Sequence, residues 1–431
     1  MDTIFAPASG RVKSAVTVIR LSGPASAQTL RAVTSGRALP PARRLGLRKI
    51  LDTSGEVIDE ALVVWFPEGA SFTGEEAAEI HLHGSPAVLA AMLRLLGGMA
   101  GLRLAEPGEF ARRAFEAGRL DLAEVEGLAD LISAETEAQR RQAVRVAQGA
   151  IGRLAAGWRE RLVRALALLE AAIDFSDQDL PDGLLDEAGA LLAAVAGDIR
   201  SEVDGARVAE RVRDGFEVAI VGRPNAGKST LLNALAGREA ALTSSIAGTT
   251  RDVIEVRMVL EGLPVTILDT AGVRDDGAGV EALGIARGVE RAREADLRVF
   301  LLADPGEQPV FPPAPGDVVV VGKSDLRSGV TDGVSGLTGA GIDNLTDRIA
   351  RELGGRTAAA GTVVAARQRI ALEGAIAALE MALEELGSVA QAPELAAEEI
   401  RRALVALERL VGRFDVEDVL DAVFAGFCIG K

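Results

Sequence analysis

Gly-Arg-Pro-Asn-Ala-Gly-Lys-Ser, residues 222–229, determines the architecture at the centre of this chain. The apolar run Phe216–Val221 precedes it and has the character of a buried strand, and Thr230–Leu235 follows as the start of a helix. A glycine-rich loop between a strand and a helix gathers backbone N–H groups and the positive end of the helix dipole around phosphate oxygens. The stretch therefore predicts a nucleoside triphosphate site.

Side chains within this loop have distinct expected tasks. Lys228 can reach the outer phosphates, and the Ser229 hydroxyl can ligate Mg²⁺. Asn225 offers a neutral oxygen that can help to hold a monovalent cation beside the phosphates. The residues of this region that we expect to contact the nucleotide are Asn225, Ala226, Gly227, Lys228, Ser229 and Thr230.

A second apolar run, Val265–Leu268, leads into Asp269-Thr270-Ala271-Gly272. A carboxylate at the end of such a strand can hold the Mg²⁺ shell, and the backbone N–H of Gly272 can sense a γ-phosphate. Between the two motifs lies Gly248-Thr249-Thr250, where a threonine hydroxyl can complete the Mg²⁺ coordination. The order and spacing of these motifs are those of GTPases.

The contact with the base is predicted where the run Val318–Val321 ends in Gly322-Lys323-Ser324-Asp325. Asp325 can accept hydrogen bonds from the N1 and N2 groups of guanine, which adenine does not offer in that arrangement. GTPases usually carry Asn at the position of Gly322, and Ala after the serine at the position of Gly336. We therefore predict GTP as the ligand, bound with lower affinity than is usual.

The machinery for hydrolysis differs from that of Ras-like GTPases, which orient water with a Gln directly after the Asp-x-x-Gly motif. Here that position is Val273, which can neither orient water nor stabilise charge. Glu281 is a carboxylate that can position the water indirectly. The residues alone leave open the alternative that Glu281 is a solvated residue at the start of a helix.

Composition restricts the class of protein. The net charge of −16 argues against indiscriminate binding to nucleic acid, so an RNA partner would need local basic patches. A single cysteine excludes an internal disulfide framework and fits a reducing cytosol. The sequence shows neither a long uncharged apolar run nor a signal-peptide pattern, so we expect a cytoplasmic protein without a membrane span.

The expected fold class is multidomain, α/β plus all-α. Residues 1–117 mix short strands with a helix near Pro86–Leu96 and predict an α+β domain. Residues 214–356 alternate strands and helices, as in a Ras-like GTPase domain. Residues 118–213 and 357–431 have helical periodicity, so we expect a GTPase domain inserted into one helical bundle. Gly354-Gly355 and Gly361 would form a flexible return linker that lets the GTPase domain move as a hinged unit.

Motifs at both ends of the chain resemble those of the tRNA modification GTPases of the MnmE, or TrmE, family. The resemblance covers essentially the whole chain in order. It is carried by Val18-Ile19-Arg20-Leu21-Ser22-Gly23-Pro24, Phe72-Thr73-Gly74-Glu75, Pro107-Gly108-Glu109-Phe110, Ile173-Asp174-Phe175 and the C-terminal Phe427-Cys428-Ile429-Gly430-Lys431. This family shares its phosphate loop with other bacterial GTPases such as Era and Der.

The resemblance implies a homodimer that works with a flavin-dependent partner, MnmG or GidA, which carries the FAD. Together they add an aminomethyl or carboxymethylaminomethyl group to carbon 5 of the wobble uridine, position 34, in certain tRNAs. The one-carbon unit comes from a 5-formyl- or methylene-tetrahydrofolate bound in the N-terminal domain, which also dimerises. By resemblance, the folate site uses Arg20, Glu79, Arg119 and Lys431; the family usually has Lys at position 119.

The resemblance also assigns roles around the nucleotide. It implies that potassium stimulates hydrolysis and is held by Asn225, Ser244, Ile246 and Thr249, and that Mg²⁺ is bound by Ser229 and Thr250. Glu281 is then the catalytic glutamate. The segment Ser244, Ser245, Ile246, Ala247, Gly248, Thr249 and Thr250 joins the GTP contacts. Cys428 is either a reactive thiol or a packed small residue, and the sequence leaves both open.

Two rival functions belong to different classes. One is a ribosome-assembly GTPase of the Era or Der type, which acts as a timed binding factor and modifies nothing. Such a protein would carry a second phosphate loop or a Gly-x-x-Gly RNA clamp, and we find neither in the sequence. The other rival is a folate-binding one-carbon protein with a degenerate GTPase, a reading to which Gly322 and Gly336 lend some weight.

Overall fold

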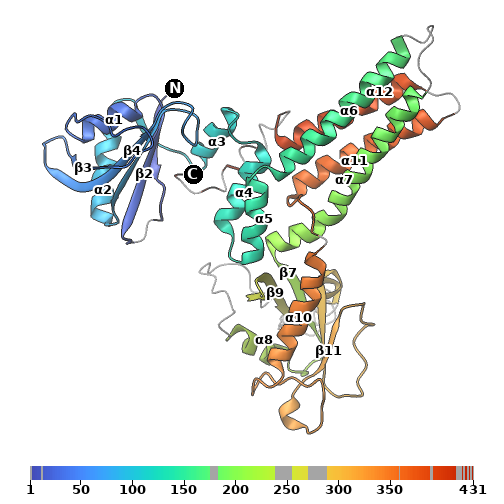
Figure 1. Cartoon of the computed structure of the whole chain (residues 1–431). Coiled ribbons are helices and arrows are strands. Elements are labelled where there is room, and N and C mark those ends of the chain that lie inside the picture. The colour runs from blue at the N-terminus through green and yellow to red at the C-terminus, as the bar shows by residue number, and fades with distance from the viewer. Residues whose placement is uncertain are drawn as a thin grey trace, which may run out of the picture. The chain divides into compact units, whose positions relative to one another are not determined.

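The computed structural model describes residues 2–10, 13–174, 183–237, 255–269, 289–358, 360–388 and 392–413, together with residues 420, 423, 424, 427 and 430. The chain forms two compact units, drawn in Figure 1. The first unit comprises Met1–Ala129 and Glu408–Lys431, and the second comprises Asp130–Leu407. No helix in the described segments combines the length and the apolar character that crossing a bilayer requires.

A six-stranded sheet organises the first unit. Its strand order is β3 (Gly46–Leu51), β4 (Val57–Phe66), β5 (Ala77–His83), β2 (Val16–Ser22), β1 (Thr3–Pro7) and β6 (Leu102–Leu104). All neighbours are antiparallel except β1 and β6, which are parallel. The predicted strands at Ala15–Arg20 and Ala61–Phe66 are present as β2 and β4.

Two helices bury the apolar side of this sheet. Helix α1 (Ser26–Val33) contributes Leu30, and α2 (Pro86–Gly97), the helix predicted near Pro86–Leu96, contributes Met92. They pack with strand residues such as Ile19 and Ile80 into one core. The opposite side of the sheet carries residues that alternate with these, because successive side chains of a strand point to opposite faces.

Helices α3 (Glu109–Glu116) and α4 (Leu122–Ser133) follow the sheet, and the end of the chain packs on them. Phe424 and Phe427 form a small core with Ala111 and Val125. An ideal Cβ on Gly430 would lie 2.1 Å from the carbonyl oxygen of Pro7, so only glycine fits there. The C-terminal segment is therefore built into the first unit.

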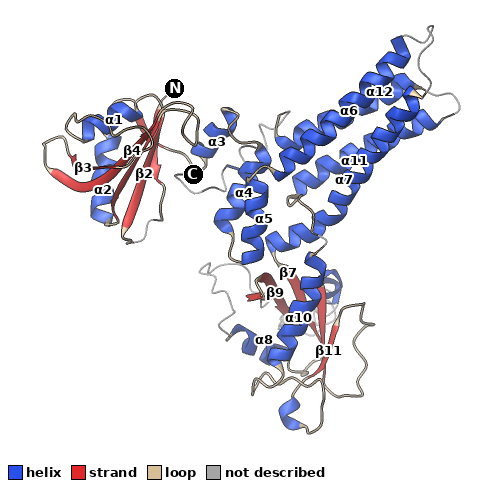
Figure 2. Ribbon diagram, in the orientation of Figure 1, coloured by secondary structure: helices blue, strands red, loops and turns tan. Residues whose placement is uncertain are grey.

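Long antiparallel helices make up much of the second unit, as the ribbon in Figure 2 shows. They are α6 (Ala150–Asp174), α7 (Leu184–Asp214), α11 (Ala366–Gly387) and α12 (Pro393–Val411), with the shorter α5 (Glu137–Ala147) before them. The predicted stripe of α11 is buried at Leu372 and Leu379. Arg401 of α12 pairs with Glu170 of α6 at 2.8 Å, so segments far apart in sequence lie side by side.

The rest of the second unit is a five-stranded sheet with the order β11 (Val318–Val321), β10 (Leu297–Leu302), β7 (Phe216–Val221), β9 (Leu263–Asp269) and β8 (Glu255–Leu260). Strands β11, β10, β7 and β9 are parallel, and β8 is antiparallel to β9. Helices α8 (Lys228–Ala236) and α10 (Ile342–Thr357) pack on the sheet. This sheet with its helices agrees with the P-loop GTPase fold class predicted for this part of the chain.

The join between the helices and this sheet is built differently from the linker that we predicted. Val212, in the last turn of α7, already lies in the core of the sheet, and Gly215 turns the chain into β7 with a φ of 103°. Gly354-Gly355, predicted as a flexible linker, lies within α10, so that prediction was wrong. Tertiary packing of Ile349 and Leu353 holds the helix together despite the two glycines. On the return path, the Gly361 N–H donates to the Gly205 carbonyl at 3.1 Å.

Candidate nucleotide site

The phosphate loop connects β7 to α8 at the carboxyl edge of the sheet, the edge at which α/β folds bind ligands. Apolar residues of β7 and Leu231 and Leu232 of α8 anchor both ends of the loop in the core. Two residues of the loop adopt left-handed backbone: Asn225 with a φ of 64° and Gly227 with a φ of 102°. Glycine reaches this region without strain and asparagine does so more readily than most residues, which explains their use here.

Lys228 lies at the first position of α8 and is only 6% exposed. Its ammonium group donates to the carbonyl oxygens of Gly222 and Arg223 at 2.8 and 3.0 Å. Burial lowers the pKa of Lys228 from its ordinary value, and the Asp269 carboxylate opposes that shift. An anionic phosphate beside this buried cation would offset the cost of its burial.

Ser229 and Asp269 meet at the centre of the site. Strands β7 and β9 are parallel neighbours, so their carboxyl ends bring the phosphate loop and Asp269 together. The Ser229 hydroxyl donates to Asp269 Oδ2 at 3.0 Å, and Asp269 is 2% exposed. A hydroxyl and a carboxylate are the hard oxygen donors that Mg²⁺ prefers, so this pair fits the predicted ion.

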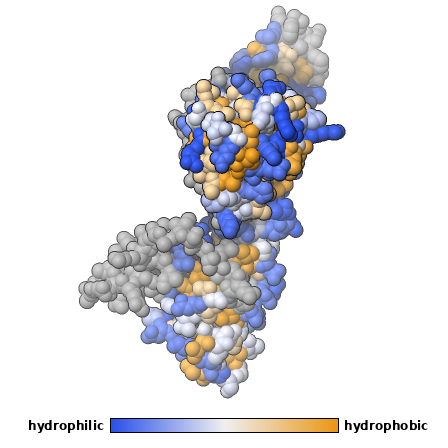
Figure 3. Space-filling model, turned by 90° about the vertical axis from the view of Figure 1, so that its left-hand side faces the viewer, coloured by the Kyte–Doolittle hydropathy of each residue, from blue (hydrophilic) through white to orange (hydrophobic). Residues whose placement is uncertain are grey.

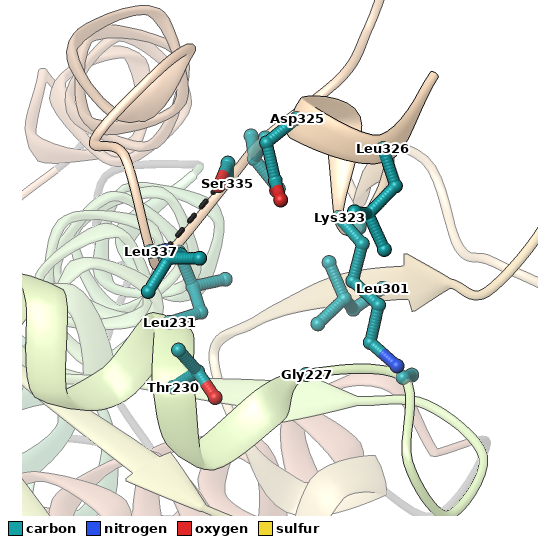
Figure 4. A pocket seen from close by; sticks show the side chains of 13 residues that line it. Gly227, Thr230, Leu231, Leu301, Lys323, Asp325, Leu326, Ser335 and Leu337 are labelled. Carbon is teal, nitrogen blue, oxygen red and sulfur yellow. Dashed lines mark hydrogen bonds between the residues drawn. The ribbon is translucent and has the colours of Figure 1, made fainter.

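A pocket of about 330 Å³ opens beside the loop, as Figure 4 shows. Asp325, from the short 3₁₀ helix η1 (Ser324–Leu326), points its carboxylate into it. The aliphatic part of the Lys323 side chain lies against the phosphate loop. A Cβ added at Gly227 would be 3.8 Å from Lys323 Cγ, which is an ordinary van der Waals distance. The lining is Ala226, Gly227, Thr230, Leu231, Leu301, Gly322, Lys323, Asp325, Leu326, Val334, Ser335, Gly336 and Leu337.

The apolar part of this lining was missed in the sequence. Leu231 and Leu301 are core residues of α8 and β10 whose proximity follows only from the fold. Leu337 had a usable signal, since it directly follows the Ser335-Gly336 pair already identified with the base. Apolar walls of this kind suit the faces of a purine ring.

Several predicted residues lie outside the described part of the chain. They are Ser244, Ser245, Ile246, Ala247, Gly248, Thr249, Thr250, Thr270, Ala271, Gly272, Glu281, Cys428 and Lys431. Their predicted roles stay predictions.

In the first unit, the structure brings together three of the four residues assigned to folate. Arg20 and Glu79 are cross-strand partners on β2 and β5, with Arg20 Nη2 3.0 Å from Glu79 Oε1. The Arg20 guanidinium also lies 5.7 Å from the ring centre of Phe72. Arg119 Nη2 approaches the carbonyl oxygen of Ser71 at 3.5 Å, so one loop, residues 71–75, contacts both arginines.

A network of charges fixes that loop. The Ser22 hydroxyl donates to Glu75 at 2.7 Å, and Arg113 donates to both Glu75 and Glu109. Burial by itself would raise the pKa of Glu109, but hydrogen bonds from Arg103, from the Glu106 N–H and from Arg113 outweigh it and hold that pKa below its ordinary value. The loop is thus tied to α3 by ionised groups.

Comparisons with known proteins cover the whole chain. The family model described as the GTP-binding protein TrmE N-terminus matches residues 3–119, and the one described as the MnmE helical domain matches residues 122–428. A tRNA modification GTPase MnmE from Cereibacter sphaeroides is 60% identical over all of both chains, and one from Ruegeria pomeroyi is 54% identical over all of both.

Among solved structures, Era from Aquifex aeolicus bound to GDP and aluminium fluoride is 25% identical, over 32% of this chain and 56% of that chain, with a TM-score of 0.23. A likeness of that size adds nothing to the argument. The full-length identity and the two family models, in contrast, identify the family. They agree with the predicted fold class: a TrmE-type N-terminal domain, a helical domain and a P-loop GTPase fold. The chain belongs to the MnmE family of tRNA modification GTPases.

Proposed function

We propose that this chain binds and hydrolyses GTP in the course of modifying tRNA. The observation that carries the proposal is the meeting of Lys228, Ser229 and Asp269 at the edge of the sheet, with Asp325 in an adjoining pocket. The first three groups suit a triphosphate with its Mg²⁺, and the fourth suits guanine. Membership of the family supplies tRNA modification as the setting.

The residues divide the work of hydrolysis. Lys228 and the loop N–H groups neutralise charge on the outer phosphates. Ser229 and Thr250 would hold Mg²⁺, which would supply further positive charge there. Glu281 positions the attacking water. Val273, which occupies the place of the water-orienting Gln of Ras-like GTPases, cannot do so. Asn225, Ser244, Ile246 and Thr249 would hold potassium, which would add positive charge to that of Lys228, and the exposed Asn225 is consistent with that task.

For the first unit we propose a tetrahydrofolate site that provides the one-carbon unit, with Arg20, Glu79, Arg119 and Lys431 as ligands. A carboxylate can hold the amino and ring N–H groups of a pterin, and cations can pair with a glutamate tail. The position of Gly430 supports the inclusion of Lys431. Gly430 lies against Pro7, and Pro7 is the cross-strand partner of Ile19, next to Arg20.

We also propose that the active form is a cytoplasmic homodimer that works with the flavin-dependent MnmG partner on the wobble uridine. The sheet of the first unit offers a surface for self-association. Leu47, Leu62, His81 and Val18 form one row across four strands, on the side that α1 and α2 do not cover. Leu47 and Leu62 are 55% and 41% exposed. Figure 3 shows apolar residues gathered among polar ones on the visible face of this unit.

The nucleotide part of the proposal is tested by GTP turnover. Lys228→Ala should lose most activity, while Lys13→Ala, at an exposed lysine of the first unit that does not line the pocket, should keep it. Asp325→Asn exchanges a carboxylate acceptor for an amide, so it should weaken GTP and favour xanthosine triphosphate, whose ring carbonyl accepts where guanine donates. Equal turnover of GTP by wild type and Lys228→Ala would overturn the proposal. Turnover measured in potassium and in sodium, with and without Asn225→Ala, tests the monovalent site.

The tRNA part is tested by mass spectrometry of tRNA nucleosides from cells with and without the gene. The 5-substituted wobble uridines should disappear with the gene and return with the intact chain, but not with Glu281→Ala. Unchanged nucleosides would refute tRNA modification and favour a ribosome-assembly GTPase, which altered ribosome profiles would then reveal.

A further inference from the structure

Gly322 and Gly336, the two departures from the usual base-recognition residues, share a structural cause. Both line the pocket, Gly322 after β11 and Gly336 after the buried Ser335. Neither has a φ in the left-handed region, so the backbone conformation does not require glycine at either position. The reason lies in the space around them.

At Gly322, the phosphate loop occupies the place of a side chain. An ideal Cβ there would lie 2.6 Å from the carbonyl oxygen of Ala226, closer than the 3.0 Å that Cβ contacts essentially always exceed. Neither partner can withdraw easily. The Gly322 N–H donates a hydrogen bond to the Leu302 carbonyl at 2.8 Å, which holds Gly322 in place. The start of the phosphate loop lies directly against the backbone of β10, since a Cβ added at Gly222 would be 2.4 Å from the Leu301 carbonyl oxygen.

At Gly336, the first turn of α8 occupies that place. An ideal Cβ would lie 2.6 Å from the carbonyl carbon of Thr230 and 2.7 Å from the nitrogen of Leu231. That turn is held by its own hydrogen bond, from the Leu231 N–H to the Gly227 carbonyl at 2.9 Å. Backbone atoms within a bonded turn do not move aside as the end of a flexible side chain does.

We propose that Gly322 and Gly336 are affinity-determining residues, which let both base-binding loops rest directly on the backbone of the phosphate loop and α8. The phosphate loop and the loops that contact the base then pack backbone against backbone, and no asparagine side chain is needed to connect them. The asparagine usual in GTPases would therefore not restore a missing contact in this chain. It would push the base-binding loop off the phosphate loop and weaken GTP binding. This inference rests on the proposed GTP function.

The test measures affinity and release rate for a fluorescent GDP in the full chain. Gly322→Ala, Gly336→Ala and Gly322→Asn should each weaken binding by about tenfold or more, mainly through faster release. Gly306→Ala is the matched control, because Gly306 has an ordinary φ and open space around its Cβ position. It should bind within about twofold of wild type.

Release is measured by chasing bound nucleotide with excess GDP, so partial misfolding of a variant does not alter the rate. If Gly322→Asn fails to fold, Gly336→Ala carries the same prediction on the other loop. Binding by Gly322→Asn or Gly336→Ala as tight as that of wild type would refute the inference while leaving the GTP function intact. Failure of wild type to bind the fluorescent GDP would instead refute the proposed function.

Discussion

Single carboxylates in the first unit hold its proposed ligand loop in place, and Glu109 is one of them. It accepts from Arg103, from Arg113 and from the Glu106 N–H, and it is 11% exposed. Loss of its charge leaves two arginines with a weaker partner. The loop at residues 71–75, joined to Glu109 through Arg113, should loosen with it.

Glu109→Gln should lower the free energy of unfolding by about 1–3 kcal/mol at neutral pH. The folded pKa of Glu109 lies below its ordinary value of 4.5, so its ionisation stabilises the fold above that value. As the pH falls below 4.5 and through the folded pKa, wild type loses this contribution and the difference between the two proteins should shrink. Denaturant unfolding at pH 7, 5 and 3.5 measures it.

The control lies on the same helix. Glu116 is 60% exposed, and its ion pair with Arg112 is long, at 3.9 Å. Glu116→Gln should therefore change the free energy of unfolding by less than about 0.5 kcal/mol. A Glu109→Gln effect that is no larger than the control, or that grows as the pH falls, would contradict this account.

Among the elements, α5 has an importance that its length does not suggest. Thr136 and Gln139 form a reciprocal cap at its start. From this first turn, the Gln139 side chain donates to the Arg213 carbonyl at 2.8 Å, just before β7, and the Ala138 N–H donates to the Gly262 carbonyl at 3.3 Å, just before β9. Strands β7 and β9 end at the phosphate loop and at Asp269. The two strands that carry the nucleotide groups thus begin on one turn of helix.

Thr136→Ala should lower the free energy of unfolding by about 1 kcal/mol, the usual cost of losing a cap. Ser201→Ala, at an exposed position within α7, is the control and should be close to neutral. Thermal unfolding of both variants, with and without GDP, measures the effect. No difference between Thr136→Ala and Ser201→Ala would show that the cap does not stabilise α5.

At the scale of the whole molecule, two compact units predict two cooperative transitions in calorimetry. GDP should raise the melting temperature of one transition only, because the pocket lies entirely within Asp130–Leu407. At a hundredfold excess over its dissociation constant, the ligand adds about 2.7 kcal/mol to the stability of the unit that binds it. A single transition that GDP shifts as a whole would refute the independence of the units.

The sequence predicted well where local pattern and packing agree. The run Phe216–Val221 is β7, because an apolar segment bounded by a glycine-rich loop has few other options. It failed at Gly354-Gly355, where glycine suggested a linker and the buried stripe of α10 prevailed. At Gly322 it predicted a lost contact. It could not reveal that the Ala226 carbonyl fills the space, since those residues are close only in the fold.

The bond between Gly361 and Gly205 has a consequence for how this protein can be rebuilt. Gly205 in α7 and Gly361 on the return path are joined by a 3.1 Å hydrogen bond, and the Thr362 N–H donates to Glu202 at 2.7 Å, although residues 206–360 lie between the two glycines. A module whose two ends meet in this way can be exchanged or excised with a short bridging loop, because its removal asks no long span of the remaining chain. The GTPase portion can thus be treated as an exchangeable insert. The helices before and after it lie next to each other in space, although the insert separates them in sequence.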